Sequence, residues 1–357
     1  MKILFPKKSR EIIFKKISEK GEPRDFFYGS LESENFDIEN SIVDTRPSKK
    51  NFNISLHNKI FNRIFRCNFS KQKSKHLFES IPLNSRVICF TDWDSINIAL
   101  HHSYRKDLKL ICGFHGLINF FERTPENFFF NKKKLFCNAL KKIHHIFFFG
   151  PEDRKESLSM FKIPENKTSL YRFGVDTEFW NKKFENEEID VLSIGSDINR
   201  NYDIYSKMNI NFNLTIITKL KTHRLDKKIK IFSGSKNEPN LSNLELKNYY
   251  NKAKIIAIPI KETLQPSGYS VTLQAMACGK PVIMTKIKGL WENKILKDMK
   301  NIIFVPPEDP KAMHQAIDLL LNNQKLREKI ALDARKTAVN FFSLKRMNED
   351  FKNLLNI

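Results

Sequence analysis

The stretch PSGYSVTLQAMACGKPVIMT, residues 266–285, runs from a small-residue loop through a segment with helical spacing into a short apolar run. Ser270 is placed to cap the helix, and Gly279 is placed to end it in a left-handed conformation before Pro281. The loop therefore precedes a helix N-terminus, where unpaired amide groups and the helix dipole favour a bound phosphate. Gly268 has no Cβ, so the backbone there can approach a phosphate oxygen closely.

Short apolar runs alternate with helical segments on both sides of this stretch. Near-continuous apolar strands between helices are typical of a parallel sheet covered on both faces. The loop at 266–269 follows the carboxyl end of one such run, which is where open α/β sheets bind ligands. In the second half we expect strands at residues 189–195, 213–218, 228–232, 254–260, 281–285 and 301–307.

The first half repeats the pattern, with strands expected at residues 86–92, 108–116, 144–150 and 168–174. Its beginning allows two interpretations. Either KILF is the first strand, or EIIFKKIS is, followed by a loop and a helix that starts near Asp25. We favour the second because Gly21 and Pro23 supply turn residues.

Length and charge limit the classes of protein. The 357 residues favour two domains, and a hydrophobic content of 41% lets each domain bury a core. With 62 basic and 40 acidic residues the formal net charge is +22, which favours an anionic partner such as nucleic acid, a membrane surface or a phosphorylated molecule. The lysines are spread through every segment and no nucleic-acid motif focuses them, so we expect no specific nucleic-acid binding.

Cysteines and apolar windows bear on the cellular compartment. The cysteines have no C-x-x-C spacing, so neither a disulfide framework nor a zinc site is indicated. No window approaches the ~18 apolar residues of a membrane span, and the apolar start of the chain is too short for a signal peptide. We therefore expect a cytoplasmic protein.

Several segments together resemble one family. PSGYSVTLQAMACGKPVI aligns without a gap with the motif E-G-F-G-x-x-x-x-E-A-M-A-x-G-x-P-V of the glycosyl transferases group 1, the large retaining family of GT-B nucleotide-sugar glycosyltransferases. RFGVDTEFW, residues 172–180, resembles the family's N-G-V-D-x-x-x-F segment. LSNLELKNYYNKAKIIAIP, NIIFVPPEDPKAMHQAI and FFSLKRMNEDFKNLL are similar to its later segments, in the same order. The resemblance covers most of residues 165–357.

The resemblance implies an α/β fold with two Rossmann-like, doubly wound domains that face each other across a cleft. We expect an N-terminal acceptor-binding domain over residues 1–182, a C-terminal donor-binding domain over 183–340, and a closing helix over 341–357 that returns to the first domain. The acidic segment at 185–188 is the expected junction. The implied reaction moves a sugar, with retention, from a nucleoside-diphosphate sugar to a hydroxyl of a glycan, lipid-linked glycan or glycolipid. It implies no cofactor beyond the donor substrate and no metal.

The family holds the donor diphosphate with an Arg and a Lys that follow the first strand of the donor domain. Here Ser196 stands in place of the Arg, and Arg200 matches the Lys with one residue deleted. Pro266 and Gln274 replace the two family glutamates that contact the donor, so Glu262 is a candidate for the missing carboxylate. The full set expected to bind the donor is Ser196, Arg200, Lys219, Glu262, Ser267, Gly268, Tyr269, Ser270 and Gln274.

Catalytic and acceptor-binding residues are expected at strand ends. His115, in GFHGL, resembles the family's histidine near the reacting centre, so His115 and Arg200 are the expected catalytic residues. Asp92 and Asp94 end another strand and are candidates for acceptor contact, with helix capping as the alternative. Arg24 is a further acceptor candidate, whose place depends on the interpretation of the N-terminus.

Two other function classes stay open. The replaced glutamates allow a GT-B protein that binds a nucleotide or glycan without transfer, and the charge allows a basic nucleic-acid-binding protein. A lipid-linked acceptor would bring the protein to the inner face of a membrane, where its cations can contact anionic lipids peripherally. Ligand-induced melting shifts with nucleotide-sugars are expected for a glycosyltransferase and for a GT-B protein that only binds. They are not expected for a nucleic-acid-binding protein.

Overall fold

The computed structural model describes residues 2–5, 14, 16–17, 21–33, 42–44, 78, 81–124, 131–183, 186–222, 225, 229–232 and 241–357. Contacts divide the chain into two units, which we describe separately. The first unit comprises Met1–Lys15, Glu34–Tyr171 and Lys352–Ile357, and the second comprises Lys16–Ser33 and Arg172–Phe351. The segment 172–182, which the sequence assigns to the first domain, is therefore grouped with the second unit.

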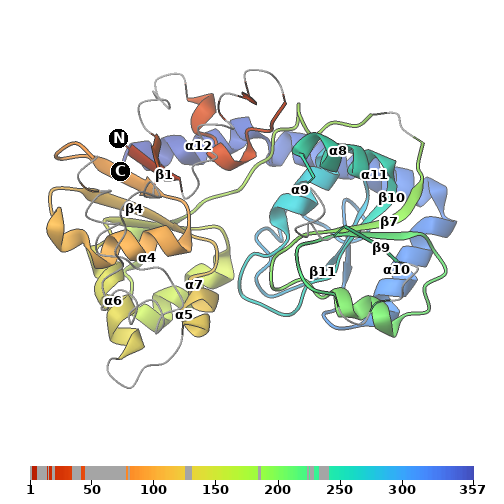
Figure 1. Ribbon diagram of the computed structural model, residues 1–357, viewed down its shortest axis with the longest axis horizontal. Helices are drawn as coiled ribbons and strands as arrows, with labels where there is room; N and C mark the ends of the chain where they lie inside the picture. Colours follow the sequence, from red (N-terminus) through yellow and green to blue (C-terminus); the bar gives the residue numbers. More distant parts are fainter. Residues whose placement is uncertain are drawn as a thin grey trace. The chain divides into compact units, whose positions relative to one another are not determined.

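Within the described residues, the first unit holds a parallel sheet with strand order β2-β1-β3-β4-β5-β6. Its strands are β1 (Lys2–Phe5), β2 (Ile42–Asp44), β3 (Arg86–Cys89), β4 (Lys109–Phe114), β5 (His145–Phe148) and β6 (Thr168–Leu170). Its helices are α4 (Asp92–Leu100), α5 (Leu117–Arg123), α6 (Lys132–Lys142) and α7 (Pro151–Phe161), with 3₁₀ turns η3 (His102–Tyr104) and η4 (Glu165–Lys167) (Figure 1). The strands expected between residues 86 and 174 are all confirmed.

The N-terminus follows the interpretation that we did not favour. KILF forms β1, which pairs in parallel with β2 on one side and β3 on the other. A short apolar run suits such an interior position, because both of its edges and both of its faces are covered there. In EIIFKKIS, residues 14, 16 and 17 are helical, so the predicted strand is wrong.

The helix expected near Asp25 is also shorter than predicted. It is a single 3₁₀ turn, η1 (Asp25–Phe27), followed by a second, η2 (Ser30–Glu32). Tyr28 and Gly29 lie between the two turns with φ of 52° and 72°. Because these left-handed conformations interrupt a right-handed helix, the segment cannot continue as one.

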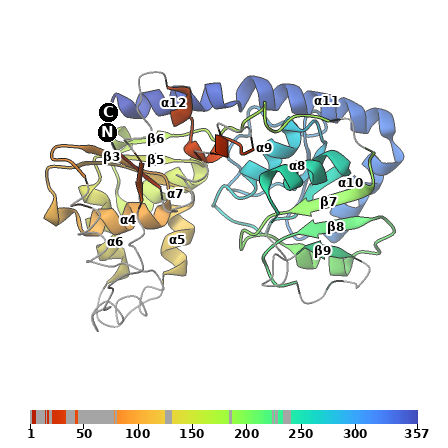
Figure 2. The same cartoon turned by 45° about the horizontal axis from the view of Figure 1, so that its top comes forward.

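The second unit holds the other parallel sheet, with strand order β12-β11-β10-β7-β8-β9. Its strands are β7 (Ile189–Ile194), β8 (Leu214–Ile217), β9 (Lys230–Phe232), β10 (Ala253–Ile258), β11 (Val282–Thr285) and β12 (Ile303–Val305). They confirm the six expected strands. The chain runs outward from β7 to β9, which lie side by side in Figure 2, and then crosses to β10 on the other side of β7. The strand order therefore reverses between β7 and β10.

Helices cover both faces of this second sheet. They are α8 (Asn243–Lys252), α9 (Tyr269–Ala277), α10 (Pro310–Asn322) and α11 (Gln324–Phe341), with the 3₁₀ helix η5 (Tyr202–Lys207). The last helix, α12 (Leu344–Leu355), is grouped with the second unit up to Phe351 and with the first unit from Lys352. Figure 1 shows α8 and α9 on one side of the sheet and α10 on the other. On the α10 side, Met313 and Ile317 pack with Tyr205 of η5 against strand residues that include Ile216 and Ile255. The doubly wound α/β class expected for this half is confirmed.

Helix α9 begins and ends at glycines. Its N-cap is Gly268, with φ of 86°, and no side chain caps the helix, so the predicted capping role of Ser270 is wrong. Ser270 instead lies in the first turn, because the left-handed glycine lets the chain turn into the helix two residues earlier. At the other end Gly279 has φ of 68°, and Gly279 N and Lys280 N donate to Met276 O and Ala275 O. This confirms the predicted terminator.

No helix in the described part of the chain is both long enough and apolar enough to cross a membrane.

Candidate functional site

The carboxyl ends of β7 and β10 meet where the strand order reverses, the position at which open α/β sheets bind ligands. The loops that leave these two strands pair through their backbones. Asn201 N donates to Pro259 O at 3.0 Å, and Lys261 N donates to Asn199 O at 2.8 Å. The predicted phosphate loop and the segment that carries Arg200 are therefore held together.

The guanidinium of Arg200 lies against two glycines of these loops. A Cβ on Gly195 would lie 2.6 Å from Nη2, and a Cβ on Gly268 would lie 3.0 Å from Nη1. Tyr202 Oη donates to Gly195 O at 2.7 Å, and burial raises the pKa of Tyr202 to about 12, so this donor keeps its proton at neutral pH. The glycine that the sequence assigns to phosphate approach thus also makes room for the cation.

Arg200 and Ser267 carry buried donors that nothing in the described structure satisfies. Nε and Nη1 of Arg200 and Oγ of Ser267 have no hydrogen-bond partner there. Only 5% of Arg200 and 1% of Ser267 is exposed. Because a buried charged donor without an acceptor is costly, such a group in a native protein calls for a ligand or other acceptor. Since both side chains can donate, the fitting ligand is an anion.

Other predicted donor residues lie at the same edge. Ser196 Oγ accepts from Lys219 N at 2.8 Å, so the ends of β7 and β8 are tied together by an exposed serine. Tyr269 and Ser270 form the first turn of α9. The Tyr269 ring contacts Phe173, with ring centroids 4.7 Å apart. The structure therefore gathers most of the expected donor set around the N-terminus of α9.

Glu262 is occupied in part by the backbone. Its Oε1 accepts from Thr263 N at 3.0 Å and from Lys288 N at 2.9 Å. The same turn is fixed by Gly289 N, which donates to Thr263 O at 2.9 Å, and a Cβ on Gly289 would lie 2.5 Å from Leu264 O. Glu262 thus holds the β11–β12 loop against the β10–α9 loop.

Gln274 is held by a carboxylate that the sequence analysis did not single out. It is 5% exposed, its Nε2 donates to Asp25 Oδ2 at 2.9 Å, and its Oε1 accepts from Tyr250 Oη at 3.3 Å. Asp25 is fully buried and also accepts from Asp176 N at 2.6 Å and Trp180 Nε1 at 2.7 Å. Burial raises the pKa of Asp25 to about 6, against these hydrogen bonds, which lower it. One signal of this contact was present in the sequence: position 274 holds a neutral amide where the family has a glutamate. A glutamate there would be repelled by the Asp25 carboxylate.

Arg24 also belongs to this part of the second unit. Its Nε donates to Asp176 Oδ2 and its Nη1 to Glu32 Oε1, both at 2.8 Å, and its Nη2 lies 3.2 Å from Glu178 Oε2. The hydrogen bond to Asp176 raises the pKa of Arg24 further above its usual range. The guanidinium proposed to bind an acceptor is therefore engaged by three carboxylates.

His115 and Asp92 lie together at the carboxyl edge of the first sheet. Gly116 N donates to Asp92 Oδ1 at 3.0 Å, and His115 Nε2 donates to Phe90 O at 2.8 Å. The imidazole stacks on Phe149, with centroids 4.0 Å apart and ring planes 4° apart. Burial lowers the pKa of His115 and raises the pKa of Asp92, while the opposite charge of each counteracts the shift of the other. A neutral imidazole is thus favoured at neutral pH.

Asp94 takes a different role. It is 3% exposed and its Oδ2 accepts from the Thr91 hydroxyl at 2.6 Å, while Thr91 Oγ1 accepts from Asp94 N at 3.4 Å at the start of α4. The cap of α4 is therefore Thr91, and the Asp94 carboxylate holds the capping hydroxyl instead of capping the helix itself. Asp153 of α7 satisfies the start of α5 directly, because it accepts from Leu117 N and Ile118 N, both at 3.0 Å, and burial raises the pKa of Asp153 to about 7.

Comparisons with known proteins agree with this architecture. Residues 202–337 match the family model described as Glycosyl transferases group 1. An uncharacterized glycosyltransferase of Methanocaldococcus jannaschii, MJ1607, is 32% identical over 112 residues, which are 31% of this chain and 27% of that protein. The matched part of the chain thus spans about a quarter of that relative's length.

Two solved structures share the fold at low sequence identity. Anabaena HepE in complex with UDP and glucose has a TM-score of 0.63 at 14% identity, covering 100% of this chain and 99% of that one. Sucrose-phosphate synthase from Thermosynechococcus elongatus has a TM-score of 0.65 at 14% identity, covering 88% and 82%. The chain thus has the two-sheet fold of GT-B glycosyltransferases, and residues 202–337 in its second unit are similar to the glycosyl transferases group 1 family.

Proposed function

We propose that the protein is a glycosyltransferase that moves a sugar from a nucleoside-diphosphate sugar to a hydroxyl of a glycan, lipid-linked glycan or glycolipid, with retention. The observation that carries the donor part is the pair of buried, unsatisfied donors, Arg200 and Ser267, at the reversal point of the second sheet. The complex of the similar HepE with UDP and glucose supports the same class of donor.

The residues at this edge suit departure of a diphosphate. When the bond between the sugar and the diphosphate breaks, the phosphate oxygen takes the electron pair and its negative charge grows. Arg200, the Ser267 hydroxyl and the amide groups in the first turn of α9 can stabilise that charge more than the ground state. The packing of Arg200 against Gly195 and Gly268 fixes the guanidinium in advance, so little reorganisation is needed.

On the acceptor side, we propose that His115 and Asp92 contact the reacting sugar or the acceptor hydroxyl. The Nε2 proton of His115 is committed to Phe90 O, so the ring keeps one orientation. The formal charge of +22 supports peripheral contact with an anionic membrane, where lipid-linked acceptors reside.

The donor proposal is tested by calorimetry of the purified protein with UDP, ADP, GDP and their sugar forms. Arg200→Ala should weaken the best of these ligands about 10- to 100-fold, because hydrogen bonds to charged groups contribute about 1.5–3 kcal/mol. Arg154→Ala is a matched control, since Arg154 pairs with Thr168 and Glu165 in the other unit. If none of the nucleotides binds, or if both variants bind equally well, the donor site is not where we place it.

A second function, binding without transfer, is favoured by one observation. Pro266 has no side-chain donor or acceptor and Gln274 is engaged by Asp25, so neither position supplies a carboxylate to a donor. Release of nucleoside diphosphate in the presence of a broad panel of acceptors would support transfer. Tight donor binding with no such release would support the second function.

A further inference from the structure

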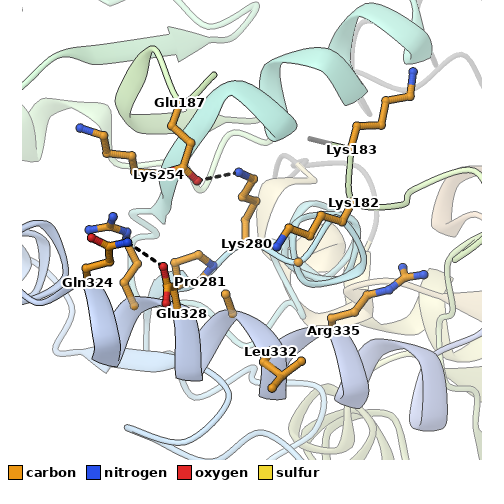
Figure 3. A pocket seen from close by; sticks show the side chains of 13 residues that line it. Lys182, Lys183, Glu187, Lys254, Lys280, Pro281, Gln324, Glu328, Leu332 and Arg335 are labelled. Atoms are coloured by element: carbon orange, nitrogen blue, oxygen red, sulfur yellow. Dashed lines mark hydrogen bonds and ion pairs between the residues drawn. The ribbon is translucent and has the colours of Figure 1, made fainter. Parts of the chain in front are cut away.

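A cavity in the second unit shows how polar side chains away from the candidate site are satisfied. It has a volume of about 320 Å³ and lies beside the residues that precede β11 and one face of α11 (Figure 3). Lys280 Nζ donates to Glu187 Oε1 at 3.0 Å, and Gln324 Nε2 donates to Glu328 Oε1 at 2.8 Å. These groups find their partners within the protein and do not call for a ligand.

The buried polar atoms that lack a partner lie elsewhere. In the described part of the second unit such atoms belong to four residues, Arg200, Asn248, Ser267 and Trp291. Arg200, Ser267 and Trp291 lie on the loops that follow β7, β10 and β11, and these strands are neighbours in the sheet. All three side chains can donate a hydrogen bond. The indole Nε1 of Trp291 is therefore a third unsatisfied donor at the edge where we place the nucleotide-sugar.

The loop that carries Trp291 is in close backbone contact with the loop that carries Ser267. A Cβ on Gly289 would lie 2.5 Å from Leu264 O and 2.6 Å from Gln265 O. Trp291 follows Gly289 by two residues. Ser267 follows Gln265 by two residues as well, and two residues of extended chain span at most ~7 Å. The two unsatisfied donors therefore belong to residues that flank the same contact.

Aromatic rings surround the indole. The ring centroids of Trp291 and Tyr269 are 6.1 Å apart with 67° between the planes, and those of Tyr269 and Phe173 are 4.7 Å apart. Only 9% of Trp291 is exposed. Nε1 is thus a neutral donor in a largely aromatic environment, which distinguishes it from the guanidinium of Arg200.

This environment suits the sugar of the donor better than its diphosphate. Phosphate is bound mainly by charged donors and by helix N-termini, which Arg200 and α9 supply. A sugar has C–H groups that pack on an aromatic ring and oxygens that accept from an indole N–H. At position 266, where the family has a glutamate that contacts the donor, this chain has Pro266. The polar group nearby is the Trp291 N–H, so a hydrogen-bond donor takes over from an acceptor.

We propose that Trp291 determines which sugar the protein accepts, by donating from Nε1 to a carbonyl or carboxylate oxygen of the transferred sugar. Such an oxygen brings no proton that needs an acceptor of its own, unlike a hydroxyl. The preferred sugar is then an acetamido sugar or a uronic acid, and an unsubstituted hexose leaves the buried N–H unpaired, which is the source of the discrimination. This inference rests on the proposed donor site.

The first experiment is calorimetric titration of the full chain with UDP, UDP-glucose, UDP-N-acetylglucosamine and UDP-glucuronate. One of the last two should bind more tightly than UDP-glucose, and which one it is distinguishes the acetamido group from the carboxylate. Trp291→Phe keeps an aromatic ring and removes the N–H. It should weaken the preferred sugar form about 3- to 10-fold and change the Kd of UDP and UDP-glucose less than twofold.

Tyr249→Phe is the matched control. It also removes one polar hydrogen from an aromatic side chain of the second unit, on α8, where the Tyr249 ring packs against Phe232 with centroids 5.2 Å apart. It should leave the Kd of all four ligands unchanged. Equal weakening of the preferred sugar form by Tyr249→Phe and Trp291→Phe would overturn the proposal.

The outcomes separate this inference from the proposed function. If none of the four ligands binds the wild type, the donor site is refuted and the role of Trp291 with it. If UDP binds but UDP-glucose binds as tightly as both substituted sugars, the donor site stands and the role of Trp291 is refuted. The same holds if Trp291→Phe weakens UDP as much as the preferred sugar form.

NMR of the nitrogen-labelled wild type observes the indole N–H directly and does not depend on the affinity of a variant. The chain has three tryptophans, and single Trp→Phe variants assign their indole resonances. Trp180 Nε1 already donates to Asp25 Oδ2 at 2.7 Å, so its resonance is an internal reference. Saturation with the preferred sugar form, and not with UDP, should move the Trp291 proton downfield by more than that of Trp180. Absence of this shift would overturn the proposal.

Discussion

Two buried polar clusters of the second unit differ in whether their polar atoms have hydrogen-bond partners. Around Asp25 and Gln274, each carboxylate and amide atom has a hydrogen-bond partner, supplied by Asp176, Trp180 and Tyr250. Around Arg200 and Ser267, buried donors have no acceptor in the described structure. A satisfied network stabilises the fold, whereas an unsatisfied one holds donors ready for a ligand. The first cluster should thus govern stability and the second should govern binding.

The largest expected effect is that of Gln274→Glu. It replaces the Gln274 amide with a carboxylate about 2.9 Å from Asp25 Oδ2, with both groups buried. At pH 8 we expect the free energy of unfolding, measured by urea denaturation, to fall by about 3–5 kcal/mol. The double variant Asp25→Asn with Gln274→Glu should recover part of the loss. A single variant as stable as the wild type would show that the pair does not interact.

The next largest effect is expected in the pH dependence of stability, through the protonation of Asp25. Burial raises its pKa from 3.8 to about 6, so between these values the folded state binds a proton that the unfolded state has lost. This contribution therefore falls as pH rises from about 4 to 6, by roughly 3 kcal/mol at 1.4 kcal/mol per unit, and is constant above. The difference between wild-type and Asp25→Asn unfolding curves isolates it, since the other carboxylates cancel. A flat difference between pH 4 and 7 would contradict the raised pKa.

Two buried serines, one with hydrogen-bond partners and one without, allow the two clusters to be compared by the same substitution. Ser193 Oγ donates to Ala257 O at 2.7 Å and accepts from Tyr205 Oη at 3.0 Å, whereas Ser267 Oγ has no partner. Ser193→Ala removes the acceptor of the buried Tyr205 hydroxyl and should cost about 1–3 kcal/mol in thermal unfolding. Ser267→Ala should change stability by less than about 0.5 kcal/mol while weakening nucleotide binding. The comparison would fail if Ser267→Ala were the more destabilising of the two.

Arg200→Met is also expected to change stability little. Removing a buried, unsatisfied charge relieves a desolvation cost, so the unfolding free energy without ligand should stay within about 1 kcal/mol of wild type or rise. The stabilisation that saturating nucleoside diphosphate adds to the wild type should be absent from the variant. Differential scanning fluorimetry with and without nucleotide measures both. A large loss of stability without ligand would mean that Arg200 serves the fold.

Much of the fold could be predicted because its signals are local. The apolar runs of the second half predicted β7 to β12, and Gly279 predicted the end of α9. The N-terminus was mispredicted because KILF and EIIFKKIS are both short and apolar, and only pairing with β3 decides between them. The start of α9 was misplaced by two residues, because a left-handed glycine and a serine are both common before a helix.

The candidate site was predictable in its place and less so in its contacts. Ser196, Arg200 and Ser267 all follow strands whose carboxyl ends share one edge of the sheet, so motif and topology agree on the place. Asp25 was not predictable, because it lies 249 residues from Gln274 and no local pattern links the two. The contacts of Arg24 were not predictable either, because Asp176 and Glu178 lie 152 and 154 residues away in the chain.

The sequence by itself determined the parallel α/β architecture, the order of the strands along the chain and the small-residue loop before α9, because periodicity, turn residues and helix termini act over a few residues. Only the tertiary structure decided which polar side chains are satisfied. Hydrogen bonding of buried groups depends on residues far apart in the chain, and it makes Gln274 a partner of Asp25 and gives Nε and Nη1 of Arg200 no acceptor among the described residues.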